Sequence, residues 1–282
     1  ATLFMACDSA SPETAANVVL QDKMDTIFKA FDGPDLPGAA VAVWKDGEII
    51  FSKGYGSANL EYGIPVRPDE TIFHVASVSK QFTVYAVKLL EAEGKLKLDD
   101  PIRDYVSEVP DFGTPVTLRH LASHTSGMRD QWDLLYLAGW RLDDVITVEH
   151  ILKLVERQEA LNFAPGAEYT YCNTGFTLLA ETVARVSGKS FAAFTKERIF
   201  EPLGMAHTLF YDDHEKIVPN RAYSYYHDEE VLKKGVLNFA NAGATSLFTT
   251  AEDLVVWANH LNNPPDAERA KIVDEMNTLA VL

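Results

Sequence analysis

Apolar side chains repeat at helical spacing near the start of the chain. Leu20, Met24 and Phe28 lie on one face of a segment that begins with Ser11-Pro12-Glu13, a hydroxyl cap followed by proline and an acid. Gly33-Pro34 is a strong stop signal for a helix. The pattern predicts an N-terminal helix that packs through one face.

The pattern then changes to extended runs. Ala39–Trp44 and Ile49–Phe51 flank Asp46-Gly47, and this dipeptide tolerates positive φ at both turn positions, which predicts a β-hairpin. A third short strand is expected over residues 71–74. From Ser79 the apolar period becomes helical again and continues to Gly94.

Most of residues 95–235 is expected to form helices and turns. Helices are predicted over 117–123, 147–158, 174–187, 190–200 and, after this stretch, 251–262. Strands near the start followed by a helical middle predict an α+β fold. We divide the chain into a terminus (1–10), an N-terminal helix and strands of an α/β subdomain (11–75), a mainly helical subdomain (76–235) and a return to the α/β subdomain (236–282).

Composition narrows the class of protein. The chain has 282 residues, of which 47% are hydrophobic and 23% charged, and its formal charge is −16. These values are typical of a globular protein, and an acidic surface disfavours nucleic acid as a partner. Two cysteines, Cys7 and Cys172, are too few for a disulfide framework. No cofactor and no metal are predicted.

Ser77-Val78-Ser79-Lys80 is the first candidate for chemistry. Residues three apart share a helix face, so Ser77 and Lys80 can meet at a helix start, where free N–H groups favour negative charge. A serine hydroxyl needs an adjacent base, and a buried lysine can serve as one when its pKa is lowered. By itself this motif is common, and a surface helix start is the alternative.

Tyr171-Cys172-Asn173 is the second candidate. In an extended segment Tyr171 and Asn173 point to one side and Cys172 to the other. The phenol can move a proton and the amide can orient the lysine and a substrate. The alternative is a loop tyrosine followed by a helix-capping asparagine.

Five segments in the same order resemble the family that contains class C serine β-lactamases, penicillin-binding DD-peptidases, D-aminopeptidases and related esterases. In chain order they are Ser77–Lys80, Leu121–Gly127, Tyr171–Asn173, Glu201–Met205 and Asn241–Leu254. The resemblance begins near Leu36 and implies a β-lactamase/transpeptidase-like fold, with an antiparallel sheet flanked by helices and a mainly helical subdomain.

The resemblance also implies roles. Ser77 attacks a carbonyl to form an acyl-enzyme, Lys80 and Tyr171 handle the proton, and Asn173 binds Lys80 and the substrate. The backbone N–H of Ser77 supplies one oxyanion donor. The substrate is a β-lactam, a D-amino-acid peptide or a carboxylic ester, and the pattern does not separate the three.

A third family motif, Lys-Thr-Gly or His-x-Gly, is expected beyond Leu282 together with strands that complete the sheet. Lys233-Lys234-Gly235 is interpreted as a solvated turn. We therefore expect the chain to be a fragment of a longer protein, or to be completed by a second chain.

Three other functions are possible for such a chain. An α/β hydrolase needs Gly-x-Ser-x-Gly, which the sequence lacks. A zinc site at His120 and His124 has no accompanying carboxylate pattern. A non-catalytic penicillin-binding-like protein, with a cell-wall-binding or regulatory role, is the remaining alternative.

Trp132, Tyr136 and Trp140 either line a cleft or, as the pattern favours, belong to the core.

Leu3–Cys7 resembles the end of a bacterial lipoprotein signal. It predicts a lipidated Cys7, membrane anchoring and a periplasmic or other extracytoplasmic location. An ordinary disordered terminus is the alternative.

Overall fold

The structure of the protein, a computed structural model, describes residues 12–278. The predictions for Cys7 and for the helix cap at Ser11 lie outside these residues. The helices are α1 (Pro12–Ile27), α2 (Ser79–Ala92), α3 (Leu118–Ala122), α4 (Gln131–Leu137), α5 (Val148–Glu156), α6 (Asn173–Ser187), α7 (Phe191–Thr195), α8 (Glu201–Leu203), α9 (Ala251–Asn262) and α10 (Ala267–Thr278). The strands are β1 (Ala39–Lys45), β2 (Glu48–Tyr55), β3 (Ser57–Asn59), β4 (Ile64–Pro65), β5 (Phe73–His74), β6 (Ile146–Thr147), β7 (Leu209–Phe210), β8 (Ser224–Asp228), β9 (Val231–Gly235), β10 (Phe239–Ala240) and β11 (Leu247–Thr249).

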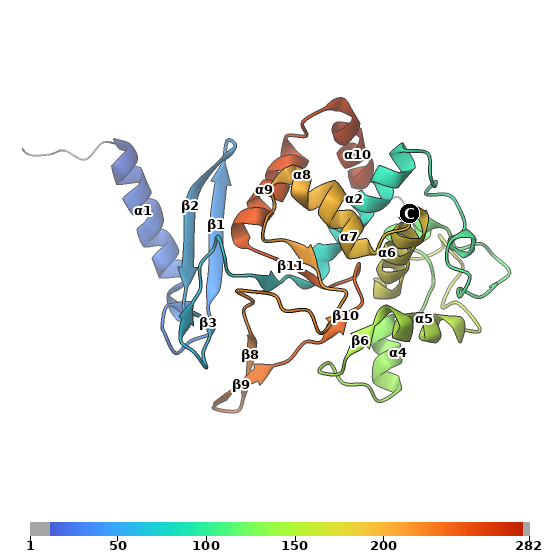
Figure 1. Ribbon diagram of the computed structural model, residues 1–282, viewed down its shortest axis with the longest axis horizontal. Helices are drawn as coiled ribbons and strands as arrows, with labels where there is room; N and C mark the ends of the chain where they lie inside the picture. The colour runs from blue at the N-terminus through green and yellow to red at the C-terminus, as the bar shows by residue number, and fades with distance from the viewer. Residues whose placement is uncertain (1–11, 279–282) are drawn as a thin grey trace, which may run out of the picture.

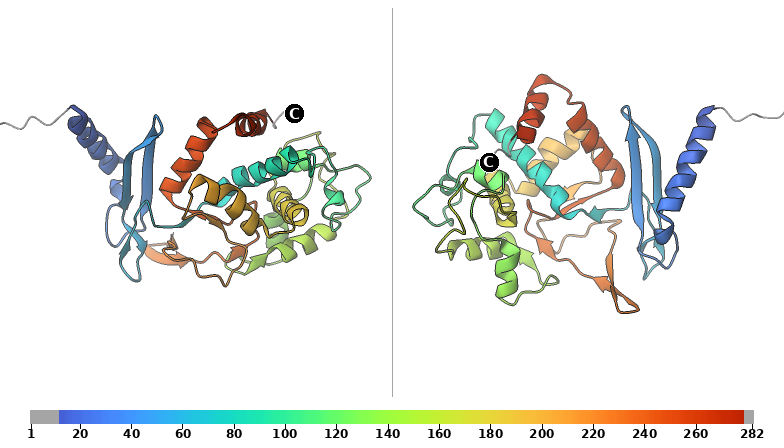
Figure 2. Two further views of the ribbon diagram at one scale, coloured as in Figure 1. Left: turned by 45° about the horizontal axis from the view of Figure 1, so that its top comes forward. Right: turned by 180° about the vertical axis from the view of Figure 1, so that it is seen from behind.

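The predicted hairpin is present as β1 and β2. The two strands pair antiparallel, and Asp46 and Gly47 between them adopt φ of 52° and 91°. Helix α1 lies along β2, where the Asp25 carboxylate accepts hydrogen bonds from Lys53 Nζ at 2.6 Å and Tyr55 Oη at 2.7 Å. Figures 1 and 2 show α1 and the hairpin side by side at one end of the molecule. Within residues 12–278, β1 pairs with β2 alone.

Helix α2 runs through the helical part of the molecule, close to α6 and α10 (Figure 1). Its predicted apolar stripe is buried. Phe82 and Tyr85 pack on Trp257 of α9, with ring centroids 4.2 and 5.2 Å away. Burial of such aromatic side chains is a main source of stability, since each removes a large apolar area from water. The helical part therefore has a continuous core.

A three-stranded antiparallel sheet, in the order β5-β11-β7, fixes the start of α2. Val75 N–H donates to the Leu247 carbonyl at 3.0 Å, and Leu247 N–H donates to Ser79 Oγ at 3.1 Å. The central strand thus holds the chain on both sides of Ser77.

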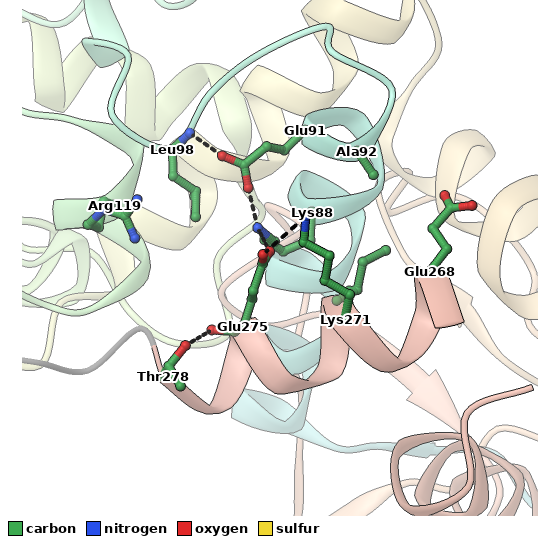
Figure 3. Close-up of a pocket in the computed structure, with 10 residues that line it drawn as sticks. Lys88, Glu91, Ala92, Leu98, Arg119, Glu268, Lys271, Glu275 and Thr278 are labelled. Atoms are coloured by element: carbon green, nitrogen blue, oxygen red, sulfur yellow. Dashed lines mark hydrogen bonds and ion pairs between the residues drawn. The ribbon is translucent and has the colours of Figure 1, made fainter. Parts of the chain in front are cut away.

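A buried lysine attaches α10 to α2. Figure 3 shows Lys88 between Glu91 of its own helix and Glu275 of α10, and it forms an ion pair with each. Lys88 is only 5% exposed, and these three side chains line a cavity of 580 Å³. Removing one member of a buried charge cluster is strongly destabilising, so this contact is expected to hold α10 in place.

The structure differs from the sequence-based assignment of elements in two respects. Lys233-Lys234-Gly235 is not a turn but the end of β9, which pairs with β8, and the turn lies at Glu229, with φ of 54°. The Asp-Glu-Glu sequence there carries no Asn-Gly or Asp-Gly signal, so the hairpin was not recognisable. Helices α4 and α10 were also not predicted.

The α+β architecture follows the prediction, with antiparallel sheets and helices. The division into subdomains stays a prediction. Among the helices within residues 12–278, none has the length and apolar character needed to cross a bilayer.

Candidate active site

Ser77 lies in a single 3-10 turn, Ala76–Val78, which leads directly into α2. Ala76 adopts φ of 46°, a left-handed conformation that is unfavourable for a residue with a Cβ. The turn is held because the Ser79 hydroxyl donates to the Ala76 carbonyl and accepts from Leu247 N–H. The Ser77 side chain is thereby left exposed to solvent at the mouth of the helix.

Lys80 lies beneath Ser77 and is 8% exposed. Its ammonium group donates to Ser77 Oγ at 3.1 Å, Asn173 Oδ1 at 2.8 Å and the Ala244 carbonyl at 2.8 Å. All three donors of a protonated lysine are therefore used, each on a neutral oxygen. Burial lowers the pKa of Lys80, while its proximity to Tyr171 and the charge of Asp130 act in the opposite direction.

Tyr171 approaches Ser77 from the other side. Its hydroxyl donates to Ser77 Oγ at 2.9 Å, and Lys80 Nζ lies 4.8 Å from the centre of its ring. The ring stacks on His124 with centroids 4.3 Å apart. Since Tyr171 is 43% exposed, its phenol can reach both Ser77 and a molecule bound above it.

Asn173 is the first residue of α6, and its side chain does not cap that helix. Its Oδ1 accepts from Lys80, and its Nδ2 donates to Asp130 Oδ2 at 2.9 Å. The same carboxylate oxygen accepts the backbone N–H of Asn173. Because the carboxylate can only accept, it fixes the orientation of the amide and turns Oδ1 toward Lys80.

His124 supports the segment that carries Tyr171. Its carbonyl accepts from Thr170 N–H at 3.0 Å, and its Nδ1 accepts from Cys172 N–H at 3.0 Å. Burial, assisted by the charge of Lys80, lowers the pKa of His124 to about 4, so the ring is neutral near pH 7. A neutral ring is required here, because Nδ1 must remain an acceptor.

The structure thus brings Ser77, Lys80, Tyr171 and Asn173 together in one cluster. It also shows two contributors that the sequence did not identify, Asp130 and the Ala244 carbonyl. An aspartate after the His-Thr-Ser-Gly turn has no diagnostic spacing to Asn173, and a backbone carbonyl leaves no trace in a side-chain pattern. Neither could have been found without the tertiary arrangement.

The remaining candidates lie elsewhere. Cys172 is a buried free cysteine whose Sγ faces the Met128 carbonyl, away from Ser77, as the alternation predicted. His120 belongs to a capping box with Thr117 at the start of α3. Within residues 12–278 no group of three or more His, Cys, Asp or Glu side chains is placed to bind a metal.

The three aromatic residues of the 132–140 segment separate. Trp132 is half-buried and packs against Phe239, with ring centroids 4.8 Å apart. Trp140 packs on His150 at 4.7 Å. Tyr136 is 80% exposed, so the expectation that it belongs to the core is wrong. It lies on the outer face of the short helix α4, whose inner face carries Gln131 and Leu135.

This geometry suits nucleophilic chemistry. Ser77 Oγ accepts hydrogen bonds from two groups that can each give up a proton, Lys80 and Tyr171. When either group is deprotonated, it becomes an acceptor for the serine proton.

Comparisons with known proteins agree with the geometry. Residues 24–280 match the family described as Beta-lactamase. D-aminopeptidases from Gluconobacter oxydans and Brucella anthropi are 30% and 32% identical over 236 and 258 residues, which is 82% and 88% of this chain. The chain spans less than half of the length of these two relatives, 43% and 46%.

Solved structures show the same fold. An octameric penicillin-binding protein homologue from Pyrococcus abyssi matches with a TM-score of 0.76 at 27% identity, over 92% of this chain and 59% of that one. The D-amino acid amidase from Ochrobactrum anthropi, in complex with L-phenylalanine amide, matches with a TM-score of 0.70 at 25% identity, over 88% and 73%.

Proposed function

The chain belongs to the Beta-lactamase family, and from that premise we propose that it is a serine hydrolase that forms an acyl-enzyme on Ser77. The observation that carries the proposal is the position of Ser77 Oγ, hydrogen-bonded to both Lys80 Nζ and Tyr171 Oη. A serine becomes a useful nucleophile only when a base of this kind is within reach.

In the proposed reaction, Ser77 Oγ attacks the carbonyl carbon of an amide, and its proton passes to neutral Lys80 or to the Tyr171 phenolate. The tetrahedral intermediate collapses when the C–N bond breaks, and the departing amine takes a proton from Tyr171. Water, deprotonated by the same pair, then attacks the ester and releases the acid and Ser77. Asn173 keeps Lys80 oriented throughout, since its own amide is fixed by Asp130.

For the substrate we propose an amide of a D-amino acid. The support is that the two curated relatives described above are D-aminopeptidases, and that a structural neighbour at 25% identity is a D-amino acid amidase. β-Lactams and carboxylic esters are the competing acyl donors, and they use the same nucleophile.

A fluorophosphonate probe tests the nucleophile. We expect one adduct, located by peptide mass spectrometry at Ser77 and absent from Ser77→Ala. Ser52→Ala is the matched control, because Ser52 is an exposed serine of β2 whose hydroxyl bonds to Glu252. Folded wild-type protein that takes no label would instead support the non-catalytic, cell-wall-binding alternative.

The substrate is tested by turnover. D-Alanine and L-alanine 4-nitroanilides, a chromogenic cephalosporin and 4-nitrophenyl acetate would be compared by kcat/KM. The proposal expects hydrolysis of the D-anilide in preference to its L-enantiomer. A higher kcat/KM for the cephalosporin would replace the amide assignment with a β-lactam one.

We also propose that the edge of β1 that is not paired with β2 pairs with a further strand. A longer form of the chain or a second chain would supply this strand. An isolated two-stranded hairpin is marginally stable, and an open edge invites pairing. Hydrogen exchange of the β1 amides would be compared between this chain and the longest natural form. Equal exchange in both would contradict the proposal.

For location we propose an extracytoplasmic site with a lipid on Cys7. Its support is the sequence resemblance of Leu3–Cys7 to a lipoprotein signal. Mass spectrometry of the native N-terminus would show a diacylglyceryl group on Cys7, and an unmodified Cys7 in the native protein would contradict it.

A further inference from the structure

A row of aromatic rings leads away from the catalytic cluster. Trp132 lies 4.8 Å from Phe239, Phe239 lies 6.3 Å from His74, and His74 lies 5.2 Å from Phe248, measured between ring centroids. We call these four side chains the aromatic row. One end adjoins the cluster, because Asp130, which binds Asn173, also accepts the backbone N–H of Trp132 at 2.9 Å.

The row also passes close to the nucleophile. His74 belongs to β5, which leads directly into the turn that carries Ser77. The Thr245 hydroxyl bonds to the His74 ring at 2.9 Å, and its neighbour Ala244 accepts from Lys80. The contact with His74 and the contact with Lys80 are therefore made by adjacent residues. His74 thus links the aromatic row to the segment that leads into Ser77 and to the residue next to the Lys80 contact.

Arg221 lies at the Phe248 end of the aromatic row. Its Cζ is 4.6 Å from the ring centroid of Phe248 and 5.2 Å from that of Tyr211, and Nη2 donates to the Leu237 carbonyl at 3.0 Å. Within residues 12–278 no carboxylate forms an ion pair with it. Lys234, which lines the same cavity, is already paired with Glu61 at 3.1 Å. Arg221 therefore has spare N–H donors in a half-buried position.

His74 offers a second donor to the same cavity. Its Nε2 accepts the backbone N–H of Ser246 at 3.3 Å, and a backbone N–H can only donate. Burial, followed by the charge of Arg221, lowers the pKa of His74 to about 4, so the ring is neutral near pH 7. With Nε2 as the acceptor, the proton of the neutral ring lies on Nδ1. No protein partner of Nδ1 is present among the described residues.

These groups meet in a cavity of 200 Å³ that is lined by His74, Arg221, Asn238 and Phe248, among others. We propose that the cavity is a subsite for a carboxylate on the acyl part of the substrate, bound by Arg221 and by His74 Nδ1–H. A guanidinium matches a carboxylate with paired N–H donors, and the rings of Phe248 and Tyr211 lie beside that guanidinium. The inference rests on the proposed acyl transfer at Ser77.

The proposal predicts a charge preference. D-Glutamate and D-glutamine 4-nitroanilides have nearly the same shape and differ in charge, so their ratio of kcat/KM isolates the carboxylate. We expect wild-type protein to favour the D-glutamate substrate, and Arg221→Gln to reduce that preference by about tenfold or more. The rate with D-glutamine should change little. Arg221→Lys should keep part of the preference, since it keeps the charge and loses the paired geometry.

Lys234→Gln is the matched control. It removes a cation at the same cavity that is already paired with Glu61, and we expect the preference to change by less than about threefold. An unchanged preference in Arg221→Gln, or an equal loss for both substrates, would overturn the subsite and leave Arg221 a structural role.

A second measurement uses wild-type protein alone, so it does not depend on the folding of a variant. Glutarate should slow fluorophosphonate labelling of Ser77 more than the neutral glutaramide does, and equal protection would overturn the subsite. Failure of the proposed function is distinguishable, because then Ser77 takes no label at all. Labelling without charge discrimination would reject only the carboxylate site.

Discussion

The helical part around α2 and the part formed by α1 and the β1–β2 hairpin differ in how deeply their side chains are buried. Helix α2 is buried along nearly its whole length, whereas no residue of β1 is fully buried. In the second part, Ile49 and Ile50 are exposed by about 40%. The candidate catalytic groups all belong to the first part. Reactive side chains must be held in a fixed geometry, and only the packed part can provide it.

Two lysines of α2 show how local surroundings decide a role. Lys80 and Lys88 lie on the same helix, two turns apart, and both are buried. Lys80 contacts neutral oxygens, while Lys88 lies between two carboxylates. Burial lowers the pKa of Lys80, whereas two carboxylates form ion pairs with Lys88. Lys80 is therefore suited to act as a base, and Lys88 joins two helices (Figure 3).

The largest expected effect is on the labelling rate of Ser77 when each of these lysines is replaced by methionine. Lys80→Met should slow fluorophosphonate labelling of Ser77 by about 1000-fold, because the base is lost. Lys88→Met is the matched control, since it removes a buried lysine from the same helix. It should leave labelling nearly intact in the folded protein and lower the free energy of unfolding by about 2 kcal/mol, because Glu91 and Glu275 lose their partner. Similar labelling rates in the two variants would remove Lys80 from the mechanism.

Acid should weaken the two parts at different pH values. Burial lowers the pKa of His74 and His124 from 6.5 to about 4, so the unfolded state binds more protons than the folded state between these values. The free energy of unfolding should therefore fall as the pH drops from 6.5 toward 4, by about 1.4 kcal/mol per pH unit for each histidine. Urea unfolding at a series of pH values measures this slope.

The contact between α1 and the hairpin should last to lower pH. The hydrogen bond from Lys53 lowers the pKa of Asp25 below 3.8, so its carboxylate stays charged through the range in which the histidines are protonated. His124→Gln should reduce the slope above pH 4. A slope that is unaffected by this change would show that His124 is not kept neutral by folding.

The smallest effect tests whether the hairpin opens independently. Gly47→Ala places a Cβ at φ of 91°, where nothing lies within 4 Å, so only backbone strain is added, about 1 kcal/mol. Hydrogen exchange should accelerate in β1 and β2 and stay unchanged in α2. Gly113→Ala, at φ of 73° with equally open surroundings, is the control in the helical part. Faster exchange in α2 after Gly47→Ala would show that the two parts open together.

The sequence predicted the elements whose signals are local. The Asp46-Gly47 turn fixed the hairpin, and apolar periodicity with a cap at Thr250 located α9 at residues 251–262. It also named Ser77, Lys80, Tyr171 and Asn173 as one group, because their two motifs resemble those of a known family. Helix α10 was missed because its residues give only a weak apolar stripe, and its place depends on Lys88.

What the sequence determined by itself was therefore the set of candidate catalytic side chains and the elements that carry them. The orientations of these side chains were decided by contacts between residues far apart in the chain: Asp130 fixes the Asn173 amide, and the Ala244 carbonyl accepts a hydrogen bond from Lys80. Such a contact also places Arg221 against the aromatic row. Such contacts are selected by the packing of the whole core, and single positions leave no periodic or local pattern that reveals them.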